Sequence, residues 1–99
     1  MLDIRVGENG EIVLSGRFDA SQAAKAETFM DALTESRNLD LGGLQYISSA
    51  GLGVLLATQK RLMSGGHALR LVNVQGHVRE VLHYSGLDRV FAIEPTPPA

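Results

Sequence analysis

The alternation of short strand-like runs with segments of helical periodicity is the feature that most constrains this 99-residue chain. Two apolar/polar alternating runs, Leu2–Val6 and Ile12–Phe18, flank Asn9-Gly10, a dipeptide typical of a type I′ hairpin turn. Further strand-like runs then alternate with helical segments, giving the order ββαβαβαβ. Strands separated by helices usually pair in parallel. The order therefore predicts a single α/β domain, with a mixed but mostly parallel sheet, an N-terminal β-hairpin and helices packed on the sheet.

Capping residues, glycines and prolines delimit the remaining elements. Asp19 or Ser21 can cap a first helix, which we expect to end near Glu35. Gly42-Gly43 is expected to end a short strand around Leu39–Leu41. The other expected elements are a helix from Ala50 to Met63, a strand from Ala68 to Val74, a helix from about Gly76 to Ser85, ended by Gly86, and a strand containing Val90, Phe91 and Ile93. We expect the domain to span residues 1–94 and the proline-rich residues 95–99 to form a non-helical tail.

Composition argues against several functional classes. The chain has 9 basic and 11 acidic residues, a formal charge of −2, which is not the footprint of a protein that binds nucleic acid or an anionic membrane. It has no cysteine, which excludes disulfides, zinc–thiolate sites and thiol catalysis. The N-terminus lacks a secretory pattern, and no apolar run approaches the roughly 20 residues of a membrane span. These features predict a cytoplasmic domain that is not inserted in a membrane.

The sequence contains no recognisable catalytic or metal-binding arrangement. The histidines His67, His77 and His83 do not have ligand spacing with carboxylates, and we interpret them as surface or boundary residues. No glycine-rich phosphate loop and no nucleophile-elbow motif occurs. We therefore expect no metal, no cofactor and no enzymatic activity.

The most unusual segment is the junction that leads into the second expected helix. Ser48 and Ser49 lie there, and we interpret Ser49 as the N-cap. Gly51 and Gly53 fall in the first turn, where each should weaken the helix by up to about 1 kcal/mol relative to alanine. Small residues would let another chain approach the backbone and would leave Ser49 open to a kinase. A plain serine cap, with glycines needed for close helix–sheet packing, explains the same residues, and both interpretations stay open.

Over nearly its whole length the chain resembles the STAS domain and, within that family, the bacterial anti-sigma factor antagonists. The resemblance rests on LDLGGLQYISSAGLG at positions 39–53, supported by Gly16-Arg17-Phe18-Asp19, Gly65-Gly66 and Ser85-Gly86-Leu87. In that family a serine at the start of the second helix is phosphorylated by an anti-sigma factor that is itself an ATP-dependent serine kinase. The unphosphorylated antagonist binds this kinase and frees the sigma factor, and a PP2C-type phosphatase resets the switch.

The resemblance also implies roles for individual residues. Alignment on Gly51-Leu52-Gly53 makes Ser49 the phosphoacceptor. Ser48 is the alternative acceptor, at a position where many members have aspartate. Asp19 matches an acidic position near the acceptor. The candidate partner-binding residues are Asp19, Ser21, Ser48, Ala50, Gly51, Leu52, Gly53 and, from its expected place on the helix surface, Thr58.

The first functional expectation is therefore a phosphorylation-controlled switch that acts on an anti-sigma factor kinase. One alternative is a constitutive STAS adaptor, a docking subunit of a signalling or transport complex in which Ser49 is only a cap. Another is a STAS domain that binds a small molecule or nucleotide, for which no dedicated pocket residues are visible. The sequence does not name the sigma factor and does not set the oligomeric state.

Overall fold

A five-stranded sheet in the order β1-β2-β3-β4-β5 organises the computed structural model, which describes residues 1–94. The elements are β1 (Leu2–Val6), β2 (Ile12–Phe18), the 3-10 turn η1 (Ala20–Gln22), α1 (Ala23–Asp31), β3 (Arg37–Ile47), α2 (Ser49–Ser64), β4 (Leu69–Val72), α3 (Gly76–Tyr84), the 3-10 turn η2 (Leu87–Arg89) and β5 (Ala92–Ile93). β1 pairs with β2 antiparallel, and the other neighbouring strands pair in parallel, which confirms the predicted topology. The expected tail at 95–99 lies outside the described residues.

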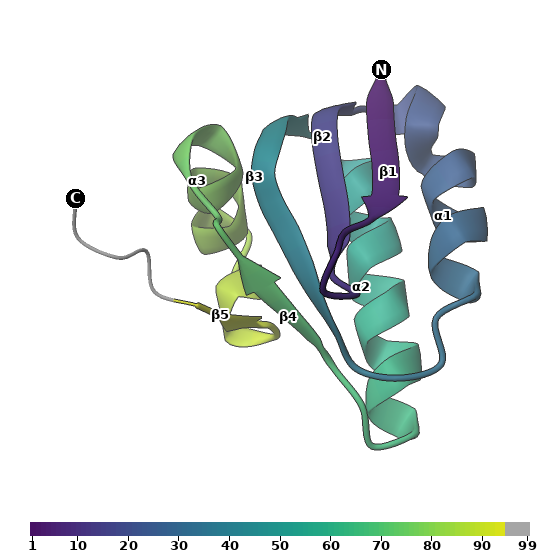
Figure 1. Ribbon diagram of the computed structural model, residues 1–99. Helices are drawn as coiled ribbons and strands as arrows, with labels where there is room; N and C mark the ends of the chain where they lie inside the picture. Colours follow the sequence, from purple (N-terminus) through teal and green to yellow (C-terminus); the bar gives the residue numbers. More distant parts are fainter. Residues whose placement is uncertain (95–99) are drawn as a thin grey trace.

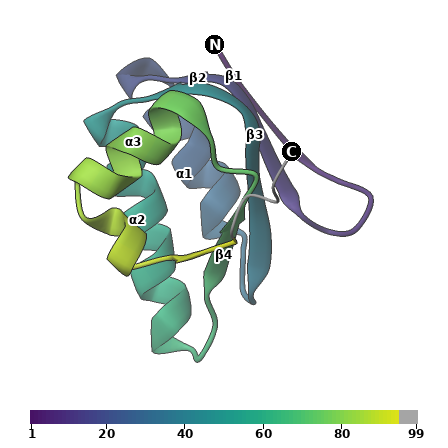
Figure 2. The same cartoon turned by 90° about the vertical axis from the view of Figure 1, so that its left-hand side faces the viewer.

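The three α-helices lie on one side of the sheet, so the domain has two layers (Figures 1 and 2). The core fills the space between them. Its fully buried strand residues are Leu2, Ile12, Leu14, Phe18, Leu39, Leu41, Leu69 and Leu71. Alternate strand positions such as Asp3, Arg5, Asn38 and Arg70 are exposed, as the period-2 pattern requires. Within residues 1–94, no helix combines the length and apolar character needed to cross a membrane.

The turn between β1 and β2 differs from the type I′ turn that Asn9-Gly10 predicts. Only the glycine of the pair has a positive φ, at 80°. The Gly7 N–H donates to the Glu11 carbonyl at 2.7 Å, and the Gly10 N–H donates to the Gly7 carbonyl at 3.1 Å. This is the pattern of a three-residue hairpin loop, in which a type I turn is followed by a left-handed glycine. The extra loop residue explains why asparagine need not adopt positive φ.

β3 is much longer than the short strand expected around Leu39–Leu41. Gly42-Gly43 does not end it, because the strand runs for 11 residues from Arg37 to Ile47. A Cβ atom on Gly43 would lie 2.9 Å from the Cβ of Ser15 on β2. The glycine therefore relieves crowding with the neighbouring strand at an irregularity in their register.

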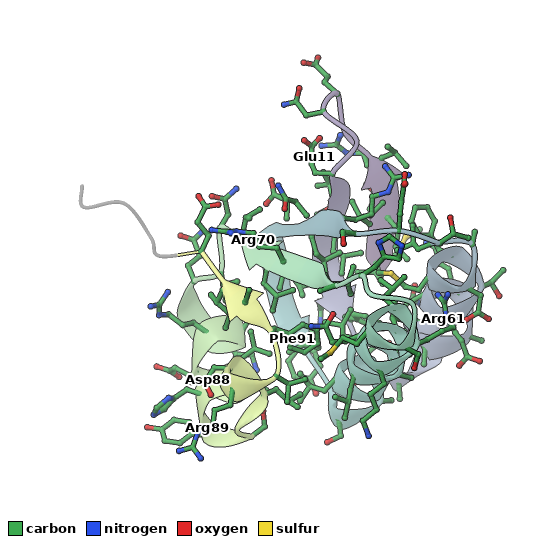
Figure 3. The ribbon with its side chains drawn as sticks, turned by 90° about the horizontal axis from the view of Figure 1, so that it is seen from below. Glu11, Arg61, Arg70, Asp88, Arg89 and Phe91 are labelled. Carbon is green, nitrogen blue, oxygen red and sulfur yellow. The ribbon has the colours of Figure 1, made fainter. Side chains whose placement is uncertain are left out.

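α1 ends at Asp31, earlier than the expected Glu35, and the 3-10 turn η1 comes directly before it. The end is fixed by a side chain from α2. Arg61 donates from Nη1 to the Leu33 carbonyl at 2.8 Å and from Nη2 to the Met30 carbonyl at 2.7 Å. Figure 3 shows Arg61 on the side of α2 that faces α1. The Met30 carbonyl also accepts the Leu33 N–H at 3.0 Å, so Arg61 adds a side-chain donor at two carbonyls near the helix end, where intrahelical donors run out.

The other elements differ from expectation only at their ends. α2 extends the expected helix by one residue at each end, and β4 is shorter than expected. Gly86 follows α3 with a φ of 78°, which confirms the predicted left-handed ending. The last strand is reduced to Ala92–Ile93 because η2 precedes it and Phe91 is buried in the core.

Candidate functional site

The carboxyl ends of β2 and β3 bring the two predicted site segments together. The Ser48 N–H donates to the Phe18 carbonyl at 2.9 Å, which joins the residue after β3 to the last residue of β2. Asp19 and Ser49, the next residue of each segment, flank this hydrogen bond. Residues about 30 apart in sequence thus meet at the start of α2.

Ser48, and not Ser49, is the N-cap of α2. Ser48 has extended backbone angles, and its Oγ accepts a hydrogen bond from the Gly51 N–H at 3.1 Å. Its carbonyl accepts the first helical bond, from Leu52, at 2.9 Å. A cap needs both the extended backbone and a side chain that reaches the N–H three residues on, and Ser48, the residue directly after β3, has both. Ser49 is therefore the first helical residue, and it is exposed.

Asp19 caps the 3-10 turn η1 beside this junction. Its Oδ1 accepts from the Ser21 hydroxyl at 2.5 Å and from the Ser21 N–H at 3.1 Å. The hydrogen bond from the Ser21 hydroxyl is the main cause that holds the pKa of Asp19 below its ordinary value. Asp19 is thus a fixed negative charge next to α2, whose own first turn contains no acidic residue.

The two glycines of α2 have different environments. A Cβ on Gly51 would lie 2.9 Å from Cγ1 of Ile47 and 3.0 Å from Cδ1 of Phe18, so this glycine is needed for internal packing. Gly53 is exposed, and a Cβ there would meet no heavy atom within 4 Å. Of the two interpretations left open by the sequence, close packing therefore explains Gly51 but leaves Gly53 unexplained.

Three more predicted site residues lie on α2. Ala50 is exposed, and Leu52 is half-buried against the core. Thr58 is only 5% exposed, and its Oγ1 donates to the Val54 carbonyl at 2.8 Å, so its expected surface placement is wrong. Thr58 lies on the same helix face as the buried Val54 and Leu55, at i+4 and i+3.

A stack of three side chains next to the site was missed in the sequence. The guanidinium of Arg17 lies 4.4 Å from the ring centre of Tyr46, and the His77 ring is stacked on Tyr46 with centroids 5.5 Å apart and planes 5° apart. Arg17 and Tyr46 are cross-strand partners because the register shifts after Gly16. The sequence pattern does not contain this strand register, so it could not place Arg17 beside Tyr46. His77 is exposed, as expected of a surface histidine.

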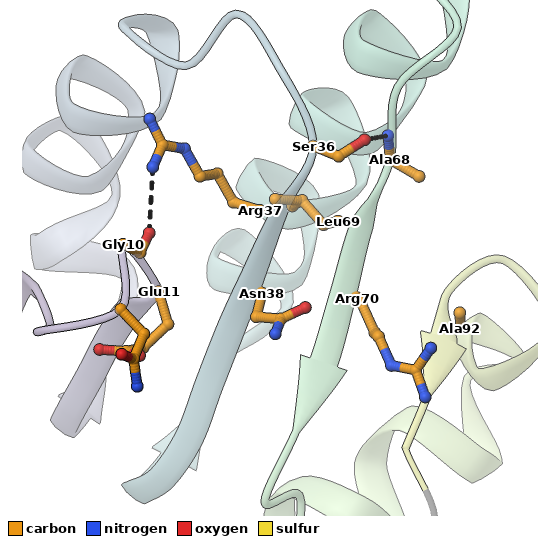
Figure 4. A pocket seen from close by; sticks show the side chains of 10 residues that line it. Gly10, Glu11, Ser36, Arg37, Asn38, Ala68, Leu69, Arg70 and Ala92 are labelled. Atoms are coloured by element: carbon orange, nitrogen blue, oxygen red, sulfur yellow. Dashed lines mark hydrogen bonds between the residues drawn. The ribbon is translucent and has the colours of Figure 1, made fainter.

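No group of three or more metal-ligating side chains occurs among residues 1–94. A hollow of about 610 Å³ lies at the far end of the sheet, where β3 and β4 begin (Figure 4). Two arginines line it, but Arg37 donates to the Gly10 carbonyl at 3.1 Å and Arg70 lies 3.7 Å from the Glu94 carboxylate. Each arginine therefore already has an acceptor within the chain, although Nε of Arg37 is buried without a hydrogen-bond partner among the described residues.

A family model described as "Mlab, STAS domain" matches residues 4–94. The chain belongs to the STAS family. Within that family it is similar to a protein of Bordetella bronchiseptica assigned as the anti-sigma factor antagonist BtrV, with 37% identity over 84 residues, 81% of this chain and 72% of that protein. These comparisons assign this chain to the anti-sigma factor antagonists of the STAS family, which are regulatory binding proteins.

Solved structures of STAS domains have the same fold. The crystal structure of an anti-sigma factor antagonist from Mycobacterium paratuberculosis superposes with a TM-score of 0.80 at 24% identity, over 97% of this chain and 86% of that one. The Bacillus cell fate determinant SpoIIAA in its phosphorylated form superposes with a TM-score of 0.60 at 21% identity, over 96% and 92% of the two chains. The STAS fold described here is therefore also adopted by a chain that carries a phosphoryl group.

Proposed function

We propose that this STAS domain binds an anti-sigma factor that is a serine kinase, releases the sigma factor, and is switched off by phosphorylation of Ser49. The observation that carries the proposal is that two adjacent serines, Ser48 and Ser49, have different environments. The hydroxyl of Ser48 is engaged as the helix cap, whereas Ser49 is exposed at the first position of α2. A kinase can reach Ser49 without dismantling the cap, so Ser49 is the acceptor and Ser48 the less favoured alternative.

The first turn of α2 suits a phosphoryl group. The first backbone N–H groups of a helix have no intrahelical acceptor, and the helix dipole favours negative charge there. A phosphate adds roughly −1.5 to −2 charge and three strong acceptor oxygens. The fold can therefore accept the modification.

The docking surface is what phosphorylation changes. Before modification, Ala50 and Gly53 offer a small, exposed surface to the partner, with the half-buried Leu52 between them. A bulky dianion on Ser49 would have to be desolvated when the partner docks. A loss of about 2.7 kcal/mol would weaken binding a hundredfold. A PP2C-type phosphatase would restore the binding form.

The test begins with phosphosite mapping after incubation with ATP and the host's anti-sigma kinases, purified one at a time. Trypsin releases residues 38–60 as one peptide that carries both serines, so fragmentation decides between them. Ser48→Asn is a matched control, because asparagine keeps an N-cap but cannot be phosphorylated. We expect this variant to be phosphorylated like the wild type and Ser49→Ala to stay unmodified.

Binding assays complete the test. Ser49→Ala should bind a cognate anti-sigma factor as the wild type does, and Ser49→Asp should bind it much more weakly. Equal affinity of all three proteins, or a well-covered peptide that stays unmodified while a control antagonist is phosphorylated, would favour a constitutive adaptor instead. Phosphate on Ser48 would keep the switch and move the acceptor.

A further inference from the structure

A groove of about 380 Å³ runs between α1 and α2, beginning beside the first turn of α2. Small residues spaced three and four positions apart line the groove on the α2 side, and the side chains of two acidic residues line it on the α1 side. The lining includes Ala50, Gly53 and Ala57 on α2, and Ala23, Glu27 and Asp31 on α1. The groove is therefore continuous with the proposed site but extends beyond it.

Gly53 is the residue of this groove that the fold does not require. An alanine Cβ would meet no heavy atom within 4 Å there, and glycine in a helix interior is less stable than alanine. Unlike Gly51, it therefore has no role in internal packing. Its absent side chain instead leaves room for another backbone to approach α2 closely.

The charge of the groove points to the partner's chemistry. Glu27 and Asp31 are both exposed and lie four residues apart on α1, where like charges oppose helix formation. Within residues 1–94 neither forms a salt bridge. Arg61 also lines the groove, but its guanidinium is held by two carbonyl oxygens near the end of α1. The two carboxylates thus remain available to a cation from outside the chain.

We propose that this groove receives a basic segment of the partner protein. A lysine or arginine of that segment contacts Glu27 and Asp31, while its backbone, carrying a small side chain, packs against Gly53. The proposal rests on the proposed function, with the same anti-sigma factor as the partner. A second copy of this chain is a poorer occupant, because two grooves facing each other would bring four carboxylates together and the chain itself has a net charge of −2.

The first test compares two pairs of neutralised carboxylates in binding to the anti-sigma factor. Glu27→Gln with Asp31→Asn removes the groove charges, and Glu8→Gln with Glu80→Gln removes two exposed charges elsewhere as a matched control. We expect the groove variant to bind at least tenfold more weakly at low salt and the control within twofold of the wild type. The difference should shrink as salt is raised, because exposed charges are screened.

The second test uses Gly53→Ala to separate binding from folding. The substitution should raise the melting temperature, because alanine favours the helix, and yet weaken binding, because its methyl group occupies the approach path. A variant that binds as the wild type does would overturn the close approach at Gly53. Equal salt-dependent binding by the groove variant and its control would overturn the charge contact.

A third measurement decides the inference even if the wild type binds no anti-sigma factor, an outcome that would count against the proposed function alone. The probe is the peptide acetyl-Ala-Arg-Ala-Arg-Ala-amide, with its glutamate counterpart as control, titrated by NMR. We expect shifts of the Ala50, Gly53 and Ala57 amides with the arginine peptide only, and their loss in the groove variant. Absent or peptide-independent shifts, or concentration-dependent dimerisation through this face, would overturn the proposal.

Discussion

The same substitution at two positions of α2 is expected to change stability in opposite directions. Gly51→Ala and Gly53→Ala both replace a glycine by the residue that best favours helix. At Gly53 the added methyl group meets nothing within 4 Å. At Gly51 it would lie 2.9 Å from Ile47 and 3.0 Å from the ring of Phe18, both of which are buried. The pair therefore separates helix propensity from packing within one helix.

The magnitudes follow from these two terms. Removing a helical glycine contributes about 1 kcal/mol of stability at either position. Extra volume in a packed core costs about 1–3 kcal/mol, a term that applies only at Gly51. Gly53→Ala should therefore stabilise the domain by up to about 1 kcal/mol, while Gly51→Ala should leave it unchanged or up to about 2 kcal/mol less stable. In a domain of this size each kcal/mol corresponds to about 4–8 °C in melting temperature.

Urea unfolding followed by circular dichroism measures both variants against the wild type. A Phe18→Leu background supplies the control, because a smaller side chain at that position should reduce the cost of Gly51→Ala and leave the effect of Gly53→Ala unchanged. The reasoning fails if Gly51→Ala proves as stabilising as Gly53→Ala, since the close contacts would then have relaxed at no cost.

Three further substitutions test other contacts. Ser48→Ala should lose about 1 kcal/mol in urea unfolding because it removes the cap of α2, whereas Ser49→Ala should stay within about 0.5 kcal/mol of the wild type; equal losses would contradict the cap assignment. Arg61→Met should cost about 1–2 kcal/mol in the same assay by leaving two carbonyl oxygens near the end of α1 without this donor, and no loss would mean that water replaces it fully. The folded-state pKa of Asp19 is lowered, so its contribution to stability is present above its ordinary pKa of 3.8 and is lost as pH falls through the folded value. Asp19→Asn should therefore flatten the fall in melting temperature between about pH 5 and pH 2, and an unchanged curve would exclude this contribution.

The order of elements and the sheet topology could be predicted because they depend on local periodicity. Strand and helix patterns alternate clearly along the chain, and a parallel sheet follows from that alternation. The ends of elements could not be predicted, because contacts between distant segments set them. α1 stops where Arg61, about 30 residues later, supplies donors, and β3 continues through Gly42-Gly43 because its pairing with β2 extends past them to Ile47.

The candidate site shows the same limit at the scale of single residues. The sequence locates the junction at Ser48 and Ser49 but cannot choose the cap, because the choice depends on where the extended backbone of β3 ends. Thr58 was placed on the surface for a similar reason. One residue rotates a helix position by about 100°, so the exposed and buried faces of α2 depend on contacts that the pattern does not contain.

The start of α2 now explains why the sequence supported two interpretations at once. In each pair of similar residues, one supports the fold and the other lies on the surface. Ser48 caps α2 and Ser49 is exposed, while Gly51 is packed in the interior and Gly53 is exposed to solvent. Because the cap does not depend on the Ser49 hydroxyl, a group added to that hydroxyl changes the surface without removing a contact that holds the helix. The proposed regulation of binding and the stability of the fold are therefore separable in this helix, and we expect a variant at Ser49 to alter binding without altering stability.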